Sequence, residues 1–250
     1  MNTVKFFLII TSCLLAINGF AQGKVTRPSN NSHSKPPQSI SGKSNIQVCI
    51  SGQINGFDFV DLGLPSAKKW ATYNVGASST SQEGLFFNWG STEPQYEFRS
   101  QEDRDKTIIK TINEFSGNIT YDAATKHMGG SWRTPTIEEL KELTENCNWQ
   151  FVSAKNFQGY KGTGPNGNYI LLPCTSWYKF LNEDQYKHYK NSARYWSCTL
   201  QSHGDVAFVL KFAKELGFSP TVYYDIVNHS LDFYDRSCTY ARLTIRAISD

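Results

Sequence analysis

The residues that most often catalyse reactions or bind metals are few in this chain, and their spacing forms no known motif. Four of the five histidines lie beyond residue 100, far apart and without the i, i+4 spacing that places two imidazoles on one helix face, so we expect surface or turn positions for them: His127, His188, His203 and His229. No two cysteines have C-x-x-C spacing, which disfavours a zinc knuckle or a thioredoxin-like motif. Residues 162–168 are glycine-rich but lack the P-loop lysine, and no Gly-x-Ser-x-Gly elbow occurs. The sequence therefore predicts no metal, no cofactor and no catalytic residue.

Aromatic side chains are better candidates for binding a ligand. They make up 14% of the chain, and in its later half they surround polar turns. Rings displayed on loops can stack on sugar faces or anchor a protein partner; the alternative is that they fill gaps between irregular loops. The candidate ligand-binding residues are Trp177, Tyr178, Tyr186, Tyr189, Tyr223, Tyr224 and Tyr234. We expect them in two loops, residues 174–195 and 219–240.

The charge balance gives no sign of a nucleic-acid partner. The formal net charge of the 250 residues is only +3, and the sequence contains no run of lysines or arginines. A chain of this length has ample material for a hydrophobic core. The partner classes that remain are glycans and proteins.

The first 21 residues have the pattern of an export signal. Lys5 supplies the positive start, an apolar stretch follows, and Gly19-Phe20-Ala21 places small residues at the minus-three and minus-one positions. Cleavage after Ala21 is expected. The alternative is a lipobox at Ile10-Thr11-Ser12-Cys13, in which Cys13 would be lipidated, but the apolar run continues beyond it. No later segment has the ~20 apolar residues of a membrane span. We therefore expect a secreted or surface protein, in the periplasm or outside the outer membrane.

Residues 22–45 are predicted to be a disordered linker, because few of them could be buried to offset the entropy of ordering. A folded domain is expected over residues 46–250. Alternation predicts early strands over residues 47–50, 57–62 and 69–75. Later strands are expected over residues 169–173, 194–199, 206–212 and 243–248.

Two short helices are predicted in the middle of the chain. The first covers residues 121–128 and ends at Gly129-Gly130. The second starts after Thr136, which has capping-box spacing with Glu139, and runs from Ile137 to about Asn146 with apolar residues along one face. Two early helices followed by many strands indicate the α+β class. Five tryptophans are expected in the core: Trp70, Trp89, Trp132, Trp149 and Trp196.

Several ordered segments resemble the Fibrobacter succinogenes major paralogous domain, a family of secreted or surface proteins common in Bacteroidetes-type bacteria. The similar segments lie between residues 57 and 248: Val60-Asp61-Leu62-Gly63-Leu64-Pro65-Ser66, Lys69-Trp70-Ala71-Thr72, Asn74-Val75-Gly76-Ala77, Phe87-Asn88-Trp89-Gly90, the stretch from Asp122 to Trp149, Gly159-Tyr160-Lys161, Thr163-Gly164-Pro165-Asn166-Gly167, Leu172-Pro173 and Tyr195-Trp196-Ser197. The resemblance implies a C-type-lectin-like fold with a mainly antiparallel sheet, paired N- and C-terminal strands, and long loops that carry the ligand. It supplies no catalytic residues.

Departures from the family pattern concern the cysteines. Removal of the signal leaves five: Cys49, Cys147, Cys174, Cys198 and Cys238. The odd count leaves at least one unpaired within the chain. Small residues usually occupy the positions of Cys174 and Cys198, so a disulfide between these two is the favoured hypothesis, with Cys198–Cys238 and Cys49–Cys238 as alternatives.

The resemblance also frames the alternatives for function. The fold is shared distantly with the sulfatase modifiers, which use a copper-binding cysteine pair, and Cys174 with Cys198 would be the only candidates for such a pair. Glu93-Pro94-Gln95 resembles the Glu-Pro-Asn of sugar-binding lectins, but its position before the second helix favours a turn. The sequence therefore predicts an exported, non-catalytic binding or cell-surface module for a glycan or a protein. The alternatives are a sulfatase-modifier-like oxidoreductase and a structural subunit of a surface assembly.

Overall fold

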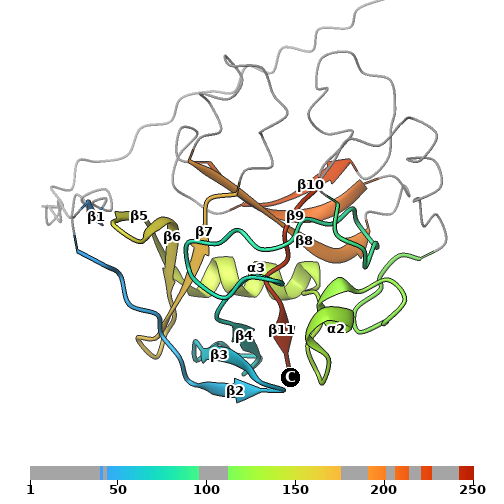
Figure 1. The fold of residues 1–250 in the computed structure, drawn as a ribbon, viewed down its shortest axis with the longest axis horizontal. Coiled ribbons are helices and arrows are strands. Elements are labelled where there is room, and N and C mark those ends of the chain that lie inside the picture. Colours follow the sequence, from blue (N-terminus) through green and yellow to red (C-terminus); the bar gives the residue numbers. More distant parts are fainter. Residues whose placement is uncertain are drawn as a thin grey trace, which may run out of the picture. The chain divides into compact units, whose positions relative to one another are not determined.

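Two helices and three small sheets form the described part of the chain (Figure 1). This computed structural model describes residues 40–41, 44–95, 112–175, 191–200, 206–213, 221–226 and 242–250, with the backbone alone for 40–41, 206, 213 and 221–226. Residues 37–250 belong to one compact unit. The predicted signal peptide lies outside the described residues, as does the predicted linker up to residue 39. The end of that linker, Ile40–Ser41, forms a short strand.

The strands pair almost entirely in antiparallel fashion. They are β1 (Ile40–Ser41), β2 (Gly52–Ile54), β3 (Phe57–Asp61), β4 (Lys69–Ala71), β5 (Asn148–Ala154), β6 (Phe157–Thr163), β7 (Tyr169–Pro173), β8 (Ser192–Leu200), β9 (Val206–Ala213), β10 (Thr221–Ile226) and β11 (Ile248–Ser249). The sheet orders are β1-β5-β6-β7, β10-β9-β8 and β11-β4-β3-β2. Only the β1–β5 pair is parallel among the named strands that the structure describes. Strand β11 near the C-terminus thus pairs with an early strand.

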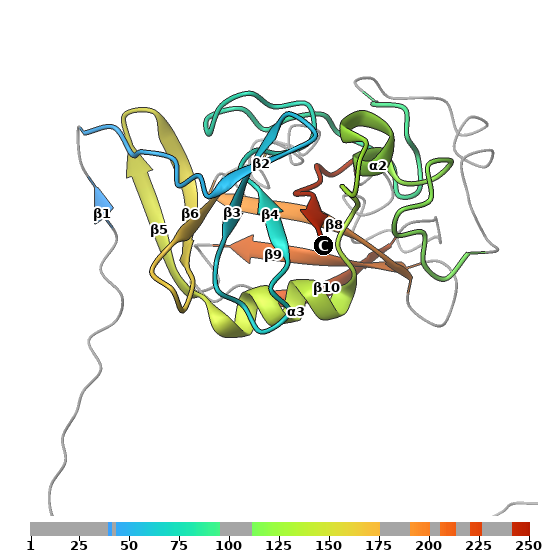
Figure 2. The same cartoon turned by 90° about the horizontal axis from the view of Figure 1, so that it is seen from below.

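Helix α3 (Ile137–Asn146) lies among the sheets and packs against β8, β9 and β10 (Figure 2). Its predicted capping box is present: Glu139 N–H donates to Thr136 Oγ1 at 3.3 Å, and Thr136 N–H donates to Glu139 Oε2 at 2.8 Å. Both bonds satisfy amides that the first helical turn would otherwise leave without partners. The buried face consists of Ile137, Leu140 and Leu143, as their spacing predicts.

The stretch between the helices is held together by the buried carboxylate of Asp122, which caps helix α2 (Ala123–Met128). This carboxylate accepts bonds from the N–H groups of Ala124, Thr125, Gly117 and Thr134 and from the Thr134 hydroxyl. A buried carboxylate is tolerated where several donors replace its water. Asp122 thus fixes the start of α2 against Thr134, which lies in the segment that leads into α3.

Strand β8 separates two hydrophobic clusters. Tyr195 packs in the cluster that contains Trp70, Leu140 and Leu143, whereas its neighbour Trp196 packs in the cluster that contains Trp132. Successive strand residues face opposite sides of a sheet, so a strand buried on both faces loses the apolar–polar alternation. Four of the five tryptophans expected in the core are fully buried, and Trp149 is half-buried against Phe212.

Several expected strands have different bounds from those predicted. Residues 47–50 form no ladder, and the early hairpin instead pairs β2 with β3 across the turn Asn55-Gly56. The β5–β6 hairpin was not predicted. Residues 243–248 are mostly extended without a continuous ladder, because they bond in turn to separate elements at Phe87, Tyr195 and Trp70. Whether a segment forms a strand is therefore easier to predict from the sequence than the strand with which it pairs.

The α+β class is confirmed by the two helices and the antiparallel sheets. Within the described residues, neither helix has the length and apolarity that crossing a membrane would require.

A pH-dependent contribution to stability is expected from Glu139. Burial of its carboxyl raises the pKa, but hydrogen bonds from Arg133 and the Thr136 N–H, with the Arg133 charge, outweigh this and hold the pKa below the usual 4.5. The two Arg133–Glu139 bonds measure 2.8 and 2.6 Å. A lowered folded-state pKa stabilises the protein above the unfolded-state pKa, and this stabilisation is lost as pH falls through the folded-state value.

We expect Glu139→Gln to lower the free energy of unfolding by about 2 kcal/mol at neutral pH, because a charge-assisted bidentate pair is removed. The difference from the parent chain should shrink below pH 4.5 in urea titrations. The matched control is Glu138→Gln, which removes an exposed charge from the same helical turn. Equal losses for the two variants, or a difference independent of pH, would contradict this assignment.

Candidate functional site

The first predicted ligand loop has a well-fixed base. Thr175 N–H donates to the Ser192 carbonyl at 3.0 Å, and Arg194 N–H donates to Thr175 Oγ1 at 3.1 Å. Asn191 is held from β6, because its carbonyl accepts from the Tyr160 hydroxyl and its Oδ1 accepts from Gln158 Nε2 at 2.6 Å. The residues between β7 and β8 therefore start and finish at one anchored point. Trp177, Tyr178, Tyr186 and Tyr189 belong to this segment and lie outside the described residues.

The second predicted loop, residues 219–240, is partly a strand. Tyr223 and Tyr224 lie in β10, where their backbones pair with Val209 and Phe208 of β9. Tyr234 lies outside the described residues. The expectation of a continuous loop here was wrong, because six residues continue the antiparallel ladder. The apolar–polar pattern of an edge strand rich in tyrosine is hard to separate from that of an aromatic loop.

The sheet topology places the strand ends next to residues 176–190 and 227–241 at different ends of the sheet. Strands β8, β9 and β10 alternate in direction, so Ser192 and Thr221 lie at one end of the sheet, and Leu200 and Ile226 lie at the other. Residues 176–190 enter at the Ser192 end, whereas residues 227–241 begin at the Ile226 end. The positions of these strand ends therefore do not support a single binding surface that combines both predicted loops.

The predicted Cys174–Cys198 disulfide is not formed, since Cys198 is a free thiol. Thr175 lies beside Ser192 at the start of β8, and Cys198 lies six positions farther along that strand. At about 3.3 Å per residue the separation is roughly 20 Å, whereas bridged Cα atoms lie within about 7 Å. Cys174 follows β7 and lies near the start of β8, whereas Cys198 lies near the end of β8, so the two cysteines do not meet. Cys238, the partner in both alternatives, lies outside the described residues.

Burial raises the pKa of two of the thiols and so disfavours their reactive thiolate form. Cys198 is fully buried, and burial, with a smaller effect of the Glu114 charge, raises its pKa to about 12. Burial likewise raises the pKa of Cys147 to about 12. Thiolates rather than thiols are nucleophilic and bind copper or zinc. Cys174 and Cys198 therefore do not provide the adjacent, ionisable pair that a sulfatase-modifier-like site needs.

Glu93 and Pro94, for which a turn was predicted, lie at and after a bend in the chain. Glu93 lies at a bend, and its N–H donates to Ser91 Oγ at 3.2 Å. Lys126 Nζ donates to the Glu93 carboxylate at 2.8 Å, and this bond, with the lysine charge, lowers the pKa of Glu93. Calcium needs six to eight oxygen ligands. No cluster of metal-binding side chains occurs in the described ranges, and four of the five histidines lie outside them.

The end of α2 and the residues between α2 and α3 are used for internal contacts. The Trp132 indole donates to the Ile54 carbonyl at 2.9 Å, and Asn55 Nδ2 donates to the Met128 carbonyl at 2.6 Å. Gly129 and Gly130 both have positive φ, and a Cβ on either would press on Asn55. Glycine is required here both for the left-handed backbone and for the close approach of the β2–β3 turn.

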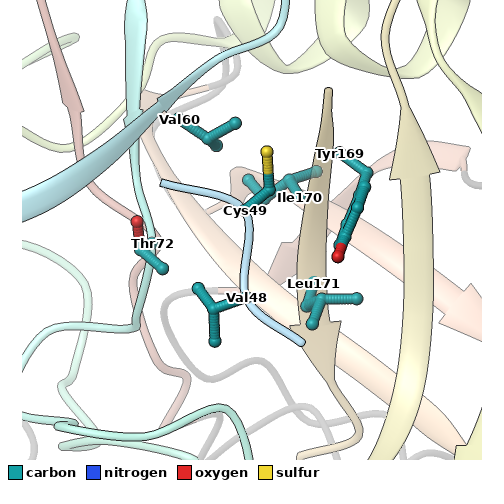
Figure 3. Close-up of a pocket in the computed structure, with 7 residues that line it drawn as sticks. All are labelled: Val48, Cys49, Val60, Thr72, Tyr169, Ile170 and Leu171. Atoms are coloured by element: carbon teal, nitrogen blue, oxygen red, sulfur yellow. The ribbon is translucent and has the colours of Figure 1, made fainter. Parts of the chain in front are cut away.

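A shallow depression lies between β7 and the residues that precede β2 (Figure 3). It is partly open to solvent, and its lining residues are Val48, Cys49, Val60, Thr72, Tyr169, Ile170 and Leu171. The segment carrying Val48 and Cys49 runs between Thr72 and β7. We call residues 44–50 the N-terminal strap. Sequence analysis missed this contact, because a partly buried segment without ladder bonds resembles a strand in its alternation.

Comparisons with protein-family models, with characterised proteins and with solved structures found no match to this chain. The candidate site therefore depends on the geometry of the described residues and on the sequence.

Thiol labelling should distinguish the cysteines. With native protein at mildly alkaline pH, we expect iodoacetamide to modify the half-buried Cys49, while the buried Cys147 and Cys198 react only after denaturation, because burial suppresses their thiolates. Peptide mapping after denaturation without reductant should find Cys198 alkylated. Recovery of a Cys174–Cys198 linked peptide would show that the free-thiol assignment is wrong.

Proposed function

We propose that this protein is an exported, non-catalytic binding or cell-surface module of C-type-lectin-like fold, which meets a glycan or protein through residues 176–190. The observation that carries the proposal is the anchored base of this segment at Thr175, Asn191 and Ser192. A binding loop held by a rigid scaffold loses less entropy when it engages a ligand. Four aromatic rings within one such loop suit stacking or hot-spot contacts.

The described topology supports the proposed fold. Ile248 and Ser249 of β11 pair with Trp70 and Lys69 of β4, which matches the paired terminal strands implied by the resemblance. The Asp122–Thr136 stretch acts as a structural junction: Arg133 exchanges backbone bonds with Ile248, and its side chain binds Glu139 and Asp250. Because these polar side chains bond to other parts of the domain, we expect the ligand to contact the segments that connect the strands.

The oxidoreductase alternative has little support from the geometry, because its candidate cysteines lie at opposite ends of β8 and the thiol of Cys198 is buried and protonated at neutral pH. The alternative of a structural subunit needs contacts between copies of a surface protein.

Replacing the two aromatic residues that follow Thr175 most closely in the sequence should weaken recognition. We expect full-length chain carrying Trp177→Ala and Tyr178→Ala to lose at least about tenfold in affinity for any glycan or protein captured by the parent chain, since aromatic anchors dominate binding energy. Glycan arrays and surface-protein pull-downs provide the ligand, and titration with that ligand provides the affinity.

The matched control is Phe57→Ala, which removes an exposed ring on β3, away from the loop base. Circular dichroism would confirm that both variants fold. Unchanged binding by the Trp177/Tyr178 variant would move the site away from residues 176–190, and no ligand from either screen would contradict the binding role.

Export can be tested on the full chain in a Gram-negative host. We expect the mature protein to start at Gln22, because Ala21 completes the small-residue cleavage site, and Cys13→Ser should leave this start unchanged. N-terminal sequencing and intact mass measure both outcomes. A chain that starts at a lipid-modified Cys13, or one that keeps Met1 inside the cell, would overturn the proposed processing.

A further inference from the structure

We propose that the N-terminal strap, residues 44–50, together with β1, is an exchangeable arm that can occupy the same groove on a second copy of this chain. The groove is formed by the edge of β5, the β5–β6 turn and the edge of β7. The inference does not depend on the ligand proposed above.

The groove recognises the backbone of the strap. Ile46 N–H donates to Asn156 Oδ1 at 2.9 Å, and Asn156 Nδ2 donates back to the Ile46 carbonyl at 3.0 Å. The Tyr169 hydroxyl donates to the Gln47 carbonyl at 3.0 Å, and Lys155 N–H donates to the Ser44 carbonyl at 3.4 Å. Before the strap, β1 extends the sheet by pairing with Val152 and Ser153 of β5. This is the bonding used when an extended peptide adds to a sheet edge.

Apolar strap side chains complete the hydrophobic clusters beneath them. Ile46 packs on the cluster of Val152, Phe157 and Leu171, and Cys49 packs on the cluster that contains Val60 and Ile170. Without the strap, these side chains and the outer edge of β5 would face solvent. An uncovered edge beside an apolar surface favours pairing with another chain. Some copy of the strap must therefore cover the groove.

The strap is held mainly by hydrogen bonds at exposed positions, which favours its local opening. The hydrogen bonds of Asn156 and Tyr169 to the strap lie at exposed positions. The depression lined by Val48 and Cys49 is partly open to solvent, and the buried Thr72 Oγ1 on its wall has no hydrogen-bond partner among the described residues. Few and exposed bonds make local opening cost much less than global unfolding.

A second copy is the occupant that fits best, because its strap offers the same side chains and the same backbone bonds. Exchange of an identical element between protomers costs little, since each closed groove keeps its native contacts. The strap joins the domain at Ser51, where Ser51 N–H donates to the Phe59 carbonyl at 2.7 Å and Ser51 Oγ accepts from Asp61 N–H at 2.9 Å. Because Ser51 is fixed just before β2, the hinge of an exchanged arm would lie at the end of the strap.

Native lysines allow a direct test on the full chain. Lys43 precedes Ser44, whose carbonyl accepts from Lys155, so a short amine-reactive reagent should link Lys43 to Lys155. Equal amounts of ¹⁴N- and ¹⁵N-labelled protein would be mixed, incubated at several concentrations, cross-linked and analysed by mass spectrometry. We expect mixed-isotope Lys43–Lys155 pairs to increase with concentration towards about half of all such pairs.

The Asn156→Ala variant separates exchange from ordinary association. Monomer and exchanged dimer contain the same strap contacts, so we expect the variant to reach mixing several-fold faster with the final mixed fraction unchanged. Asn146→Ala is the control, because Asn146 is exposed and bonds only within α3, to the Glu142 carbonyl. Other lysine pairs give the background of random cross-links. Mixed pairs at that background at every concentration, or a final fraction that falls in Asn156→Ala, would overturn the proposal.

Discussion

The buried guanidinium of Arg246 is the interaction that joins the sheets. Its Nη1 donates to the carbonyls of Ala71 and Thr72 at 3.1 and 2.9 Å, its Nη2 donates to Leu171 O at 2.9 Å, and its Nε donates to Asn74 Oδ1 at 2.9 Å. These acceptors are all neutral oxygens, and burial lowers the pKa of Arg246 to about 10. The group remains charged at neutral pH, so its desolvation is compensated by the planar fork of donors. Any shift of β4 against β7 would break several of these bonds together.

Other polar groups extend the same junction to the rest of the frame. Arg133 and Ile248 exchange backbone bonds, which ties the stretch before α3 to the strand that follows Arg246. The Trp196 indole donates to Phe87 O at 2.9 Å, and the Trp89 indole donates to Ser197 O at 2.9 Å. Buried donors placed in this way cost free energy if either partner moves. The short sheets therefore behave as one support although no ladder runs through all three.

This support has different consequences for the two proposed surfaces. Thr175 and Asn191, which flank the proposed ligand segment, are bonded to it. The strap lies against its margin through exposed hydrogen bonds, beside a depression that is partly open to solvent. The same frame thus combines a fixed base with a weakly held arm. An arm of this kind can open without disturbing the junction at Arg246, because none of the bonds of that guanidinium goes to the strap.

The sequence by itself determined features encoded by neighbouring residues. The capping box at Thr136 and Glu139, the glycine stop after α2 and strand β7 at Tyr169–Pro173 all depend on local geometry, and each was predicted. Tertiary structure alone decided which distant groups meet: Asp122 with Thr134, Arg246 with Leu171, Asn156 with Ile46. It also separated Cys174 from Cys198 and turned part of a predicted loop into β10. The physical reason is that hydrogen bonding and burial depend on positions in space, whereas caps and turns depend on positions along the chain.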